Sequence, residues 1–471
     1  MSWWLIYTLG SALWIVVNAV IILLQRRSAA ATISWLLALV FLPIIGLVVY
    51  RLIGPLKLER RKRRRSDARR IVEEGMRGLA DLDARAADHH QLAMIPIQLG
   101  GAPPLRADSV EIYLDGAANY AAILEAVAAA RDHVHLEYYI WEPDTIGTQL
   151  RDLLIERARA GIAVRVLLDG TGSKLSRRFL RPLRDAGATV AWFNPVRLLA
   201  WPWRRRRIDF RSHRKIVICD GRIGFTGGMN ITDLHSAKLA KDYWRDTHVR
   251  FTGAAVWPLQ RVFFEDWYYA TDELLPVTNE TIPPPPPGGD HLIQVVASGP
   301  DDTSFAIHKT YFAAITHAKE RIWLTTPYFI PDDALLTALI TAALRGVDVR
   351  VLVPRRGDSR LVDLAARSYF PELLEAGVHV LEYQPRFIHA KTMIADRDIA
   401  IIGTANFDNR SFRLDFEIAA VLFGESANTQ LADAFVRDCA DSRERTKDDA
   451  ARLSFPRRLG EASARLLSPL L

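Results

Sequence analysis

One pattern of catalytic residue types occurs twice in the chain, and this repetition limits what the chain can fold into. The copies are His213-x-Lys215-x4-Asp220 and His389-x-Lys391-x4-Asp396. Seven residues after each Asp, a turn of small residues begins, and these turns end in Asn230 and Asn406. The turns begin at Gly227 and Gly403, so five residue types (His, Lys, Asp, Gly and Asn) recur at matched offsets. This predicts a protein of two related halves that together build one site.

The surroundings of the pattern repeat as well. The stretch GIAVRVLLD at 161–169 corresponds to GVDVRVLVP at 346–354, and each follows a helix-forming stretch. A helix that ends at Gly and leads into an apolar strand is typical of a buried α/β sheet. PPPPPGG at 283–289 separates the halves and reads as a semi-rigid linker. The sequence therefore predicts a duplicated α/β fold.

The motif residues suit chemistry at a phosphodiester. In HRKIVICD, His213 and Lys215 are two apart and so share one face of a strand. With an ordinary pKa of about 6.5, one histidine can attack phosphorus and form a phosphohistidine while the other protonates the departing alcohol. Lysines and asparagines would hold the non-bridging oxygens. This scheme requires no metal and no cofactor.

The candidate site residues have two kinds of role. The candidate catalytic residues are His213, Lys215, Asp220, His389, Lys391 and Asp396, and the candidate phosphate-binding residues are Asn230 and Asn406. For the two aspartates, a role in stabilising the local structure of the motif is the favoured alternative.

Several stretches resemble the phospholipase D superfamily and, within it, bacterial cardiolipin synthases. They include YWRDTHVRFTG at 243–253, TPYFIPD at 326–332 and GTANFDNRSFRLDFE at 403–417. The resemblance implies two tandem sandwich domains of mixed sheets flanked by helices. It also implies that Asp246 and Glu417 orient the histidines. The resemblance does not decide which histidine is the nucleophile, and we favour His213. The implied reaction joins two phosphatidylglycerols into cardiolipin and releases glycerol.

Two positions depart from the family pattern, and two other functions stay open. Gly228 stands where many superfamily members have Ser, and Asp415 stands where the cardiolipin synthase pattern usually has Asn. Both departures bear on acceptor preference more than on reaction type. The alternatives are a phospholipase D that uses water and releases phosphatidic acid, and a phosphodiesterase that acts on nucleic acid.

The N-terminus predicts a membrane anchor. Residues 3–24 and 28–50 carry no charged side chain, and either is long enough to cross a hydrocarbon core of about 30 Å as a helix. Residues 51–70 hold ten basic and two acidic residues, a net charge of +8, whereas the whole chain carries +7. The positive-inside rule then predicts that the catalytic domains face the cytoplasm. Together with the resemblance, this implies a multi-pass protein of the bacterial inner membrane. We expect the basic run to contact anionic headgroups rather than nucleic acid.

These features divide the chain into five parts. They are two transmembrane helices (1–54), a basic connector (55–105), a first phospholipase-D-like domain (106–278), a linker (279–290), and a second domain with a C-terminal helix (291–471). An insert at 197–210 with two Trp and a run of Arg predicts bilayer contact, with a solvated loop as the alternative. The segment 455–471 fits either an interfacial helix or a helix packed on the domain. Two cysteines, Cys219 and Cys439, indicate no disulfide framework.

Overall fold

The protein divides into two compact units. The computed structural model describes residues 3–24, 29–41, 70, 91–195, 210–284, 288–301 and 304–471. One unit is Met1–Arg63 with Val196–Asp209, and the other is Arg64–Pro195 with Phe210–Leu471. The second unit contains both copies of the motif, so the halves that carry them form one body.

The described residues of the first unit form the helices α1 (Trp3–Leu24) and α2 (Ala29–Phe41). Ile22 and Leu39 are buried between them, with Trp35 and Leu36 packed alongside. Within the described ranges, no helix combines the length and the hydrophobicity needed to cross a membrane. Residues 42–50 of the second expected span, the basic run up to residue 69, and most of the Trp/Arg insert lie outside the described residues.

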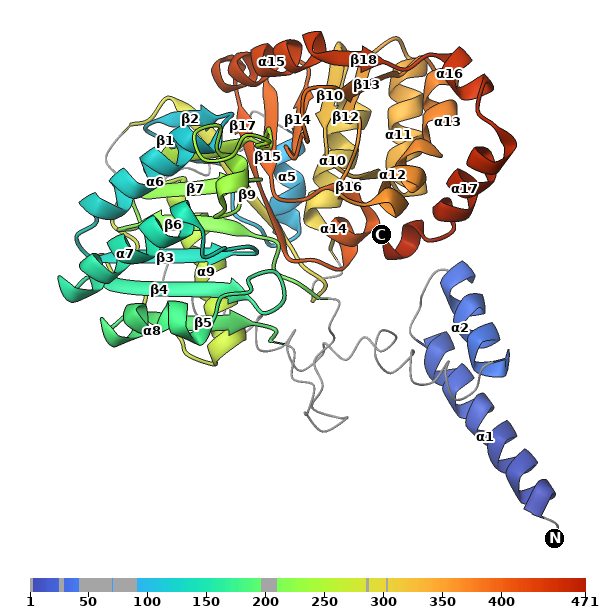
Figure 1. Cartoon of the computed structure of the whole chain (residues 1–471), viewed down its shortest axis with the longest axis horizontal. Coiled ribbons are helices and arrows are strands. Elements are labelled where there is room, and N and C mark those ends of the chain that lie inside the picture. The colour runs from blue at the N-terminus through green and yellow to red at the C-terminus, as the bar shows by residue number, and fades with distance from the viewer. Residues whose placement is uncertain are drawn as a thin grey trace. The chain divides into compact units, whose positions relative to one another are not determined.

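The first half of the second unit is built on a seven-stranded sheet of order β2-β8-β7-β6-β3-β4-β5 (Figure 1). β3, β4 and β5 are parallel, and the other neighbours are antiparallel. Its strands are β2 (Val110–Tyr113), β3 (His133–Tyr138), β4 (Ala163–Asp169), β5 (Thr189–Phe193), β6 (Lys215–Cys219), β7 (Ile223–Gly227) and β8 (His248–Thr252). Its helices are α6 (Gly116–Ala129), α7 (Thr145–Arg159), α8 (Arg177–Asp185) and α9 (Val256–Thr271), followed along the chain by the linker.

The second half repeats this order in a nine-stranded sheet, β1-β9-β17-β15-β14-β10-β12-β13-β18. Its strands are β1 (Leu105–Ala107), β9 (His291–Ser298), β10 (Arg321–Thr325), β12 (Asp348–Pro354), β13 (His379–Tyr383), β14 (Thr392–Ala395), β15 (Ile399–Gly403), β17 (Glu417–Phe423) and β18 (Ser442–Glu444). β1 precedes the first half in the chain but pairs with β9 of the second half. The domain boundary expected at residue 106 therefore lies inside a strand of the other sheet.

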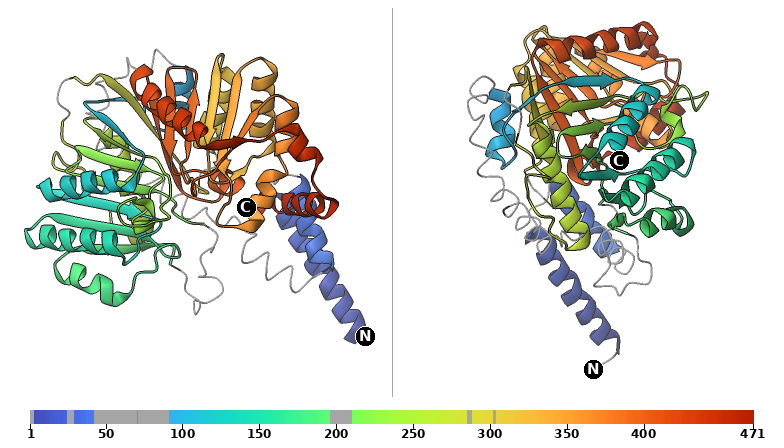
Figure 2. Two further views of the ribbon diagram at one scale, coloured as in Figure 1. Left: turned by 45° about the horizontal axis from the view of Figure 1, so that its top comes forward. Right: turned by 90° about the vertical axis from the view of Figure 1, so that its left-hand side faces the viewer.

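The remaining elements are short or cover the second sheet. The helices are α5 (Gln91–Gln98), α10 (Ala306–His317), α11 (Asp333–Leu344), α12 (Arg360–Arg367), α13 (Phe370–Glu375), α14 (Asn409–Arg413), α15 (Glu425–Ala440), α16 (Lys447–Ala451) and α17 (Phe455–Arg465). The short strands β11 (Phe329–Ile330) and β16 (Phe407–Asp408) pair with each other, and the 3-10 turns are η4 (Asp233–His235) and η5 (Ser468–Leu470). Figure 2 shows helices on both sides of each sheet. The prediction of mixed sheets flanked by helices is confirmed.

Matched local signals explain why the two halves fold alike. Asp144 and Asp332 cap α7 and α11 by accepting an N–H from the first turn of each helix. Gly161 and Gly346 follow these helices with φ of +88° and +89°, a conformation that ends a helix without a side-chain penalty. In each half, the chain then enters a buried parallel strand, which is β4 in the first half and β12 in the second.

A buried arginine ties the two halves together. Arg214, the residue between His213 and Lys215, donates from Nε to the Glu417 carbonyl (3.1 Å) and from Nη2 to the Ser298 carbonyl (3.1 Å). Its guanidinium also pairs with Asp266 of α9. Nearby, burial and the Asp266 charge raise the pKa of Glu137 well above its ordinary value, and the Ser212 hydroxyl donates to Glu137. The carboxylate that pairs with Arg214 is therefore that of Asp266, whereas the raised pKa of Glu137 favours its protonated form.

We expect Asp266→Asn to destabilise the protein by about 3 kcal/mol, because it leaves the buried Arg214 charge without its carboxylate. Glu137→Gln is the matched control, because the raised pKa of Glu137 favours its neutral form and Gln keeps an acceptor for the Ser212 hydroxyl. Thermal unfolding of the detergent-solubilised protein measures both. Equal midpoints for the two variants would contradict the assignment of the ionised carboxylate.

Candidate active site

The first motif histidine is held by a carboxylate from the other half. His213 lies just before β6, and its Nδ1 is 3.1 Å and 3.3 Å from the two oxygens of Glu417, the first residue of β17. The backbones are joined as well: His213 N donates to the Phe416 carbonyl (2.9 Å), and Phe416 N donates to the Arg211 carbonyl (2.8 Å). The position of His213 therefore depends directly on the second half.

The second motif histidine mirrors this arrangement. Nδ1 of His389 lies 2.7 Å from Oδ2 of Asp246, which belongs to the first half. His389 N donates to the Arg245 carbonyl (2.7 Å), and Arg245 N donates to the Phe387 carbonyl (3.0 Å). The two halves have thus exchanged carboxylates, and each histidine–carboxylate pair spans the contact between them.

Both motif lysines are buried beside the histidines. Nζ of Lys215 donates to the carbonyl of His213 (2.6 Å), and Nζ of Lys391 donates to the carbonyl of His389. Burial lowers the pKa of Lys215 to about 7 and that of Lys391 to about 8, although Glu417 and Asp246 raise both. Near neutral pH the lysines are therefore only partly charged until an anion joins them.

The same burial keeps the histidines neutral in the free site. Burial lowers the pKa of His213, Lys215 acts in the same direction, and Glu417 opposes both. For His389, burial and the neighbouring cations Lys391 and Lys215 hold the pKa well below 6.5. A carboxylate that accepts from Nδ1 fixes the proton there, which leaves the Nε2 lone pair free to react.

The carboxylate of Glu417 remains ionised. Burial by itself would raise its pKa, but attraction to His213, the hydrogen bond to that ring and the charge of Lys215 lower the pKa overall. The hydroxyl of Thr404 also donates to Glu417. Glu417 can therefore stabilise positive charge on His213.

The two motif aspartates hold backbone rather than substrate. The carboxylate of Asp220 accepts the N–H groups of Arg131, Asp132 and His133 at 2.8–2.9 Å. Asp396 does the same for Lys319, Glu320 and Arg321 at 2.7–3.1 Å. These bonds occupy both carboxylates at the turns before β3 and β10, which fits the favoured alternative of a structural role for Asp220 and Asp396.

The two asparagines are buried at the ends of their turns. Oδ1 of Asn230 accepts the N–H of Ile140 (3.3 Å), and its Nδ2 makes no hydrogen bond within the described part of the chain. Asn406 is fixed through its backbone N–H, which donates to Ser411 (3.1 Å). Both side chains keep polar capacity that a phosphate can use.

The position of the Asp246 carboxylate explains why residue 228 is Gly here and not the Ser of many superfamily members. A Cβ on residue 228 would lie 2.0 Å from Oδ1 of Asp246, so the carboxylate occupies the space of a side chain there. The equivalent residue of the second half is Thr404, whose hydroxyl contacts Glu417. Sequence reasoning missed this coupling because residue 228 follows β7 and residue 246 precedes β8, so no strand periodicity relates them.

Aromatic rings that were not among the predicted site residues lie beside the histidines. The ring of Tyr139 lies 4.8 Å from that of His213. Trp244 and Phe387 lie 5.2 Å and 5.7 Å from His389. Of these aromatic residues, only Phe387 stands next to a motif in the sequence, two residues before His389.

Asp415 carries less charge than its residue type suggests. Burial raises its pKa well above 3.8, which Arg410, 3.3 Å away, only partly offsets. The raised pKa favours the protonated form of Asp415, so the negative charge expected at this position is reduced. Arg413 pairs with Asp332 at 2.9 Å.

Among the described residues, one group has donors that could hold a metal ion. The ligand atoms of His235, Asp246 and His389 lie within 4.8 Å of one another. Two of these atoms already form the 2.7 Å hydrogen bond between His389 and Asp246. Metal binding and the histidine–carboxylate pair would therefore compete for the same atoms.

Fold and site together define an enzyme of the phospholipase D type. A family model described as "Cardiolipin synthase, PLD-like domain" matches residues 123–239 and 311–439. A second, "Phospholipase_D-nuclease N-terminal", matches residues 12–55.

Known relatives agree over nearly the whole chain. A cardiolipin synthase of Alkalihalophilus pseudofirmus is 42% identical over 99% of this chain and 95% of its own, and one of a Geobacillus species is 40% identical over 97% and 92%. The chain belongs to the cardiolipin synthase family. The phosphatidylserine synthase structure from Haemophilus influenzae covers 81% of this chain and 100% of its own with a TM-score of 0.61; at 14% identity it supports the fold alone.

We expect Gly228→Ser to lower kcat at least about tenfold, because its Cβ displaces Asp246 from the base it orients. Gly460→Ala is the matched control, since nothing lies within 4 Å of a Cβ at Gly460. Steady-state rates and thermal midpoints of both variants make the comparison. An unchanged rate in Gly228→Ser would show that Asp246 tolerates the displacement.

We expect kcat/KM to fall as the pH rises from about 7 to about 9, the range in which the free enzyme loses the charges on Lys215 and Lys391. The protonated form of lysine is the charged one, so anion binding is strongest below both pKa values. A profile at constant ionic strength measures the falling limb. A limb that begins only near pH 10 would mean that the lysines are not perturbed.

Proposed function

We propose that this protein is a membrane-bound phosphatidyltransferase that makes cardiolipin from two phosphatidylglycerols and releases glycerol. The observation that carries the proposal is the pair of exchanged histidine–carboxylate contacts, His213–Glu417 and His389–Asp246. They supply two oriented imidazoles, which is what a transfer in two half-reactions requires. Membership of the cardiolipin synthase family supports the lipid substrate.

In the first half-reaction, Nε2 of His213 attacks phosphorus of one phosphatidylglycerol. The bond from phosphorus to the glycerol oxygen breaks, and His389 gives that oxygen a proton. Glycerol leaves, and the phosphatidyl group stays on His213. The arriving anion favours protonation of His389, and Asp246 stabilises the imidazolium that results.

In the second half-reaction the same groups act in reverse. His389 removes the proton from a glycerol hydroxyl of the second phosphatidylglycerol, whose oxygen attacks phosphorus. The bond to His213 breaks, and cardiolipin is the product. Lys215, Lys391 and the asparagine amides hold the non-bridging oxygens in both steps.

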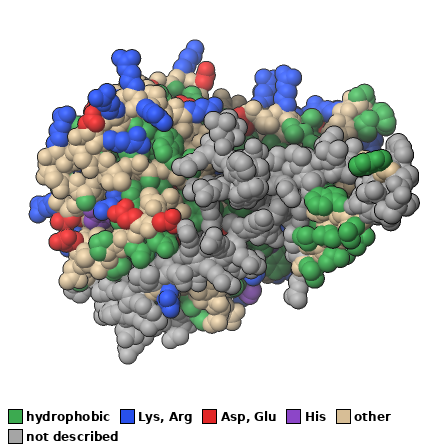
Figure 3. Space-filling view, turned by 90° about the horizontal axis from the view of Figure 1, so that it is seen from below, with side chains coloured by type: hydrophobic (Ala, Val, Ile, Leu, Met, Phe, Trp, Pro, Cys, Tyr) green, Lys and Arg blue, Asp and Glu red, His purple; other side chains and the backbone are tan. Residues whose placement is uncertain are grey.

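We propose further that residues 1–54 anchor the enzyme in the bacterial inner membrane, with the catalytic halves on the cytoplasmic side. The uncharged residues 3–24 and 28–50 and the basic run after them support this arrangement. On the face drawn in Figure 3, Lys and Arg side chains gather along the upper edge, which suits a surface that meets anionic headgroups.

The decisive experiment follows the lipid products. The full-length protein in liposomes receives labelled phosphatidylglycerol with a chelator present, and cardiolipin and free glycerol are quantified. We expect both in equal amounts from the wild type. Phosphatidic acid alone would make the enzyme a hydrolase, and turnover of DNA but not lipid would overturn the proposal.

We expect His213→Ala and His389→Ala each to abolish cardiolipin formation. A phosphatidyl ester of p-nitrophenol separates their roles, because its leaving group needs no acid. His389→Ala should release one burst of nitrophenol and keep a phosphatidyl group on His213, while His213→Ala should release none. The reverse pattern would exchange the two roles, and substantial cardiolipin synthesis by either variant would refute the scheme.

A further inference from the structure

The C-terminal helix α17 presents an apolar stripe to solvent. Phe455, Leu459 and Leu466 are 75%, 55% and 81% exposed. Their spacing of four and seven residues places them on one face of the helix, and Ala462 lies between them. Glu461 and Ala464 on the opposite side are buried. This helix therefore turns its apolar side outward, opposite to what a surface helix of a soluble domain normally does.

The stripe is held in place and is not a loose end. Arg465 of α17 donates to Glu372 of α13 (2.5 Å). Just beyond the helix, Ser468 accepts the hydroxyl of Tyr369 (2.9 Å), and the Leu471 carbonyl accepts the N–H of Arg410 (3.1 Å). The exposed side chains are thus displayed by a fixed support.

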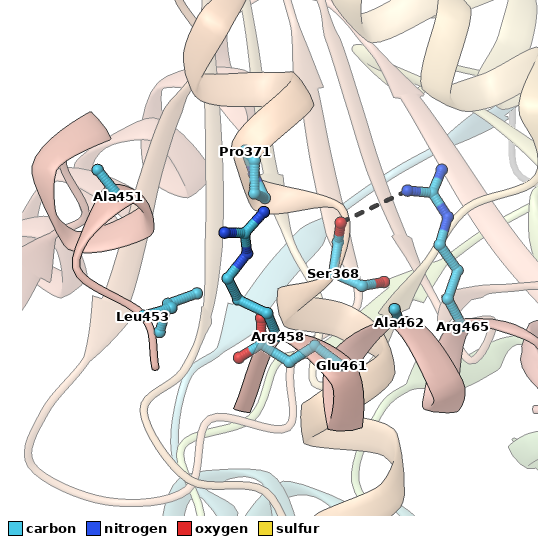
Figure 4. Close-up of a pocket in the computed structure, with 8 residues that line it drawn as sticks. All are labelled: Ser368, Pro371, Ala451, Leu453, Arg458, Glu461, Ala462 and Arg465. Atoms are coloured by element: carbon cyan, nitrogen blue, oxygen red, sulfur yellow. Dashed lines mark hydrogen bonds between the residues drawn. The ribbon is translucent and has the colours of Figure 1, made fainter. Parts of the chain in front are cut away.

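Two arginines flank the stripe at a pocket. The pocket has a volume of about 340 Å³, and Figure 4 shows the side chains of Arg458 and Arg465 extending from α17 on the side of Ser368. These arginines are seven residues apart and so lie on one flank of the helix. Pro371 and Leu453 supply apolar walls. A guanidinium fork matches the oxygens of a phosphate, and the apolar walls suit the carbon atoms beside one.

We propose that α17 docks the catalytic body on an anionic bilayer, with Phe455, Leu459 and Leu466 inserted among the acyl chains and a lipid phosphate bound by Arg458 and Arg465. An apolar face bordered by arginines is the chemistry of interfacial helices, and the positive flank selects an anionic surface. The inference rests on the proposed function, because an enzyme that acts on phospholipids has to bind them at the surface of the membrane.

The test places a polarity-sensitive fluorophore on the stripe of the full-length protein in active liposomes. Leu459→Cys is labelled with NBD in a Cys439→Ser background, since Cys219 is buried. Arg181→Cys on α8, where the arginine side chain is 80% exposed, is the control site. We expect the label at 459 to shift to the blue and to be quenched by nitroxide lipids, and the label at 181 to respond only to iodide in the water.

The charge of the bilayer provides the second measurement. The quenching at 459 should need anionic lipid, and Arg458→Gln should raise the anionic lipid content required about fivefold. If 459 responds to iodide as 181 does, the docking proposal fails. If 459 is shielded from both quenchers, protein covers the stripe and the proposal fails too. Cardiolipin formation, measured in the same liposomes, reports separately on the proposed function.

Discussion

The exchange of carboxylates between the two halves is the interaction on which the rest of the structure depends. Glu417 of the second half holds His213, and Asp246 of the first half holds His389. Neither half contains a complete site, so the contact between them has to form before any chemistry can occur. The backbone bonds beside each pair, and the three-way contacts of Arg214, make this contact part of the fold itself.

Burial then decides the charge of the site. Lys215 and Lys391 lose part of their positive charge, and both histidines become neutral. The negative charge of a bound phosphodiester raises the pKa of the buried lysines and histidines and so favours their protonated forms. Substrate binding and protonation of the site are therefore coupled. Asp415 favours its protonated form more than an ordinary aspartate does, because burial raises its pKa. The free site therefore avoids a concentration of like charges that it could not stabilise.

The sequence predicted the duplicated α/β fold because the repeated order of motif, glycine and apolar strand is local information. It also predicted that His213 and Lys215 act at one site, because strand periodicity puts them on one face. Periodicity could not show that Asp220 would bind the turn before β3, since that contact joins strands far apart in the chain. The dependence of Asp246 on Gly228 was hidden for the same reason. Only the family resemblance pointed to Asp246 and Glu417.

The two histidine–carboxylate pairs are alike in plan but differ in surroundings. His389 makes the shorter hydrogen bond, 2.7 Å to Asp246, and lies among the rings of Trp244 and Phe387. In the proposed cycle it gains and loses a proton in each turnover, and a tight carboxylate contact in a dry setting keeps its ring in one orientation throughout. His213 instead meets a carboxylate that is further fixed by Thr404. That support suits a ring that carries a covalent phosphoryl group, because the cation it becomes has to persist until the second lipid arrives.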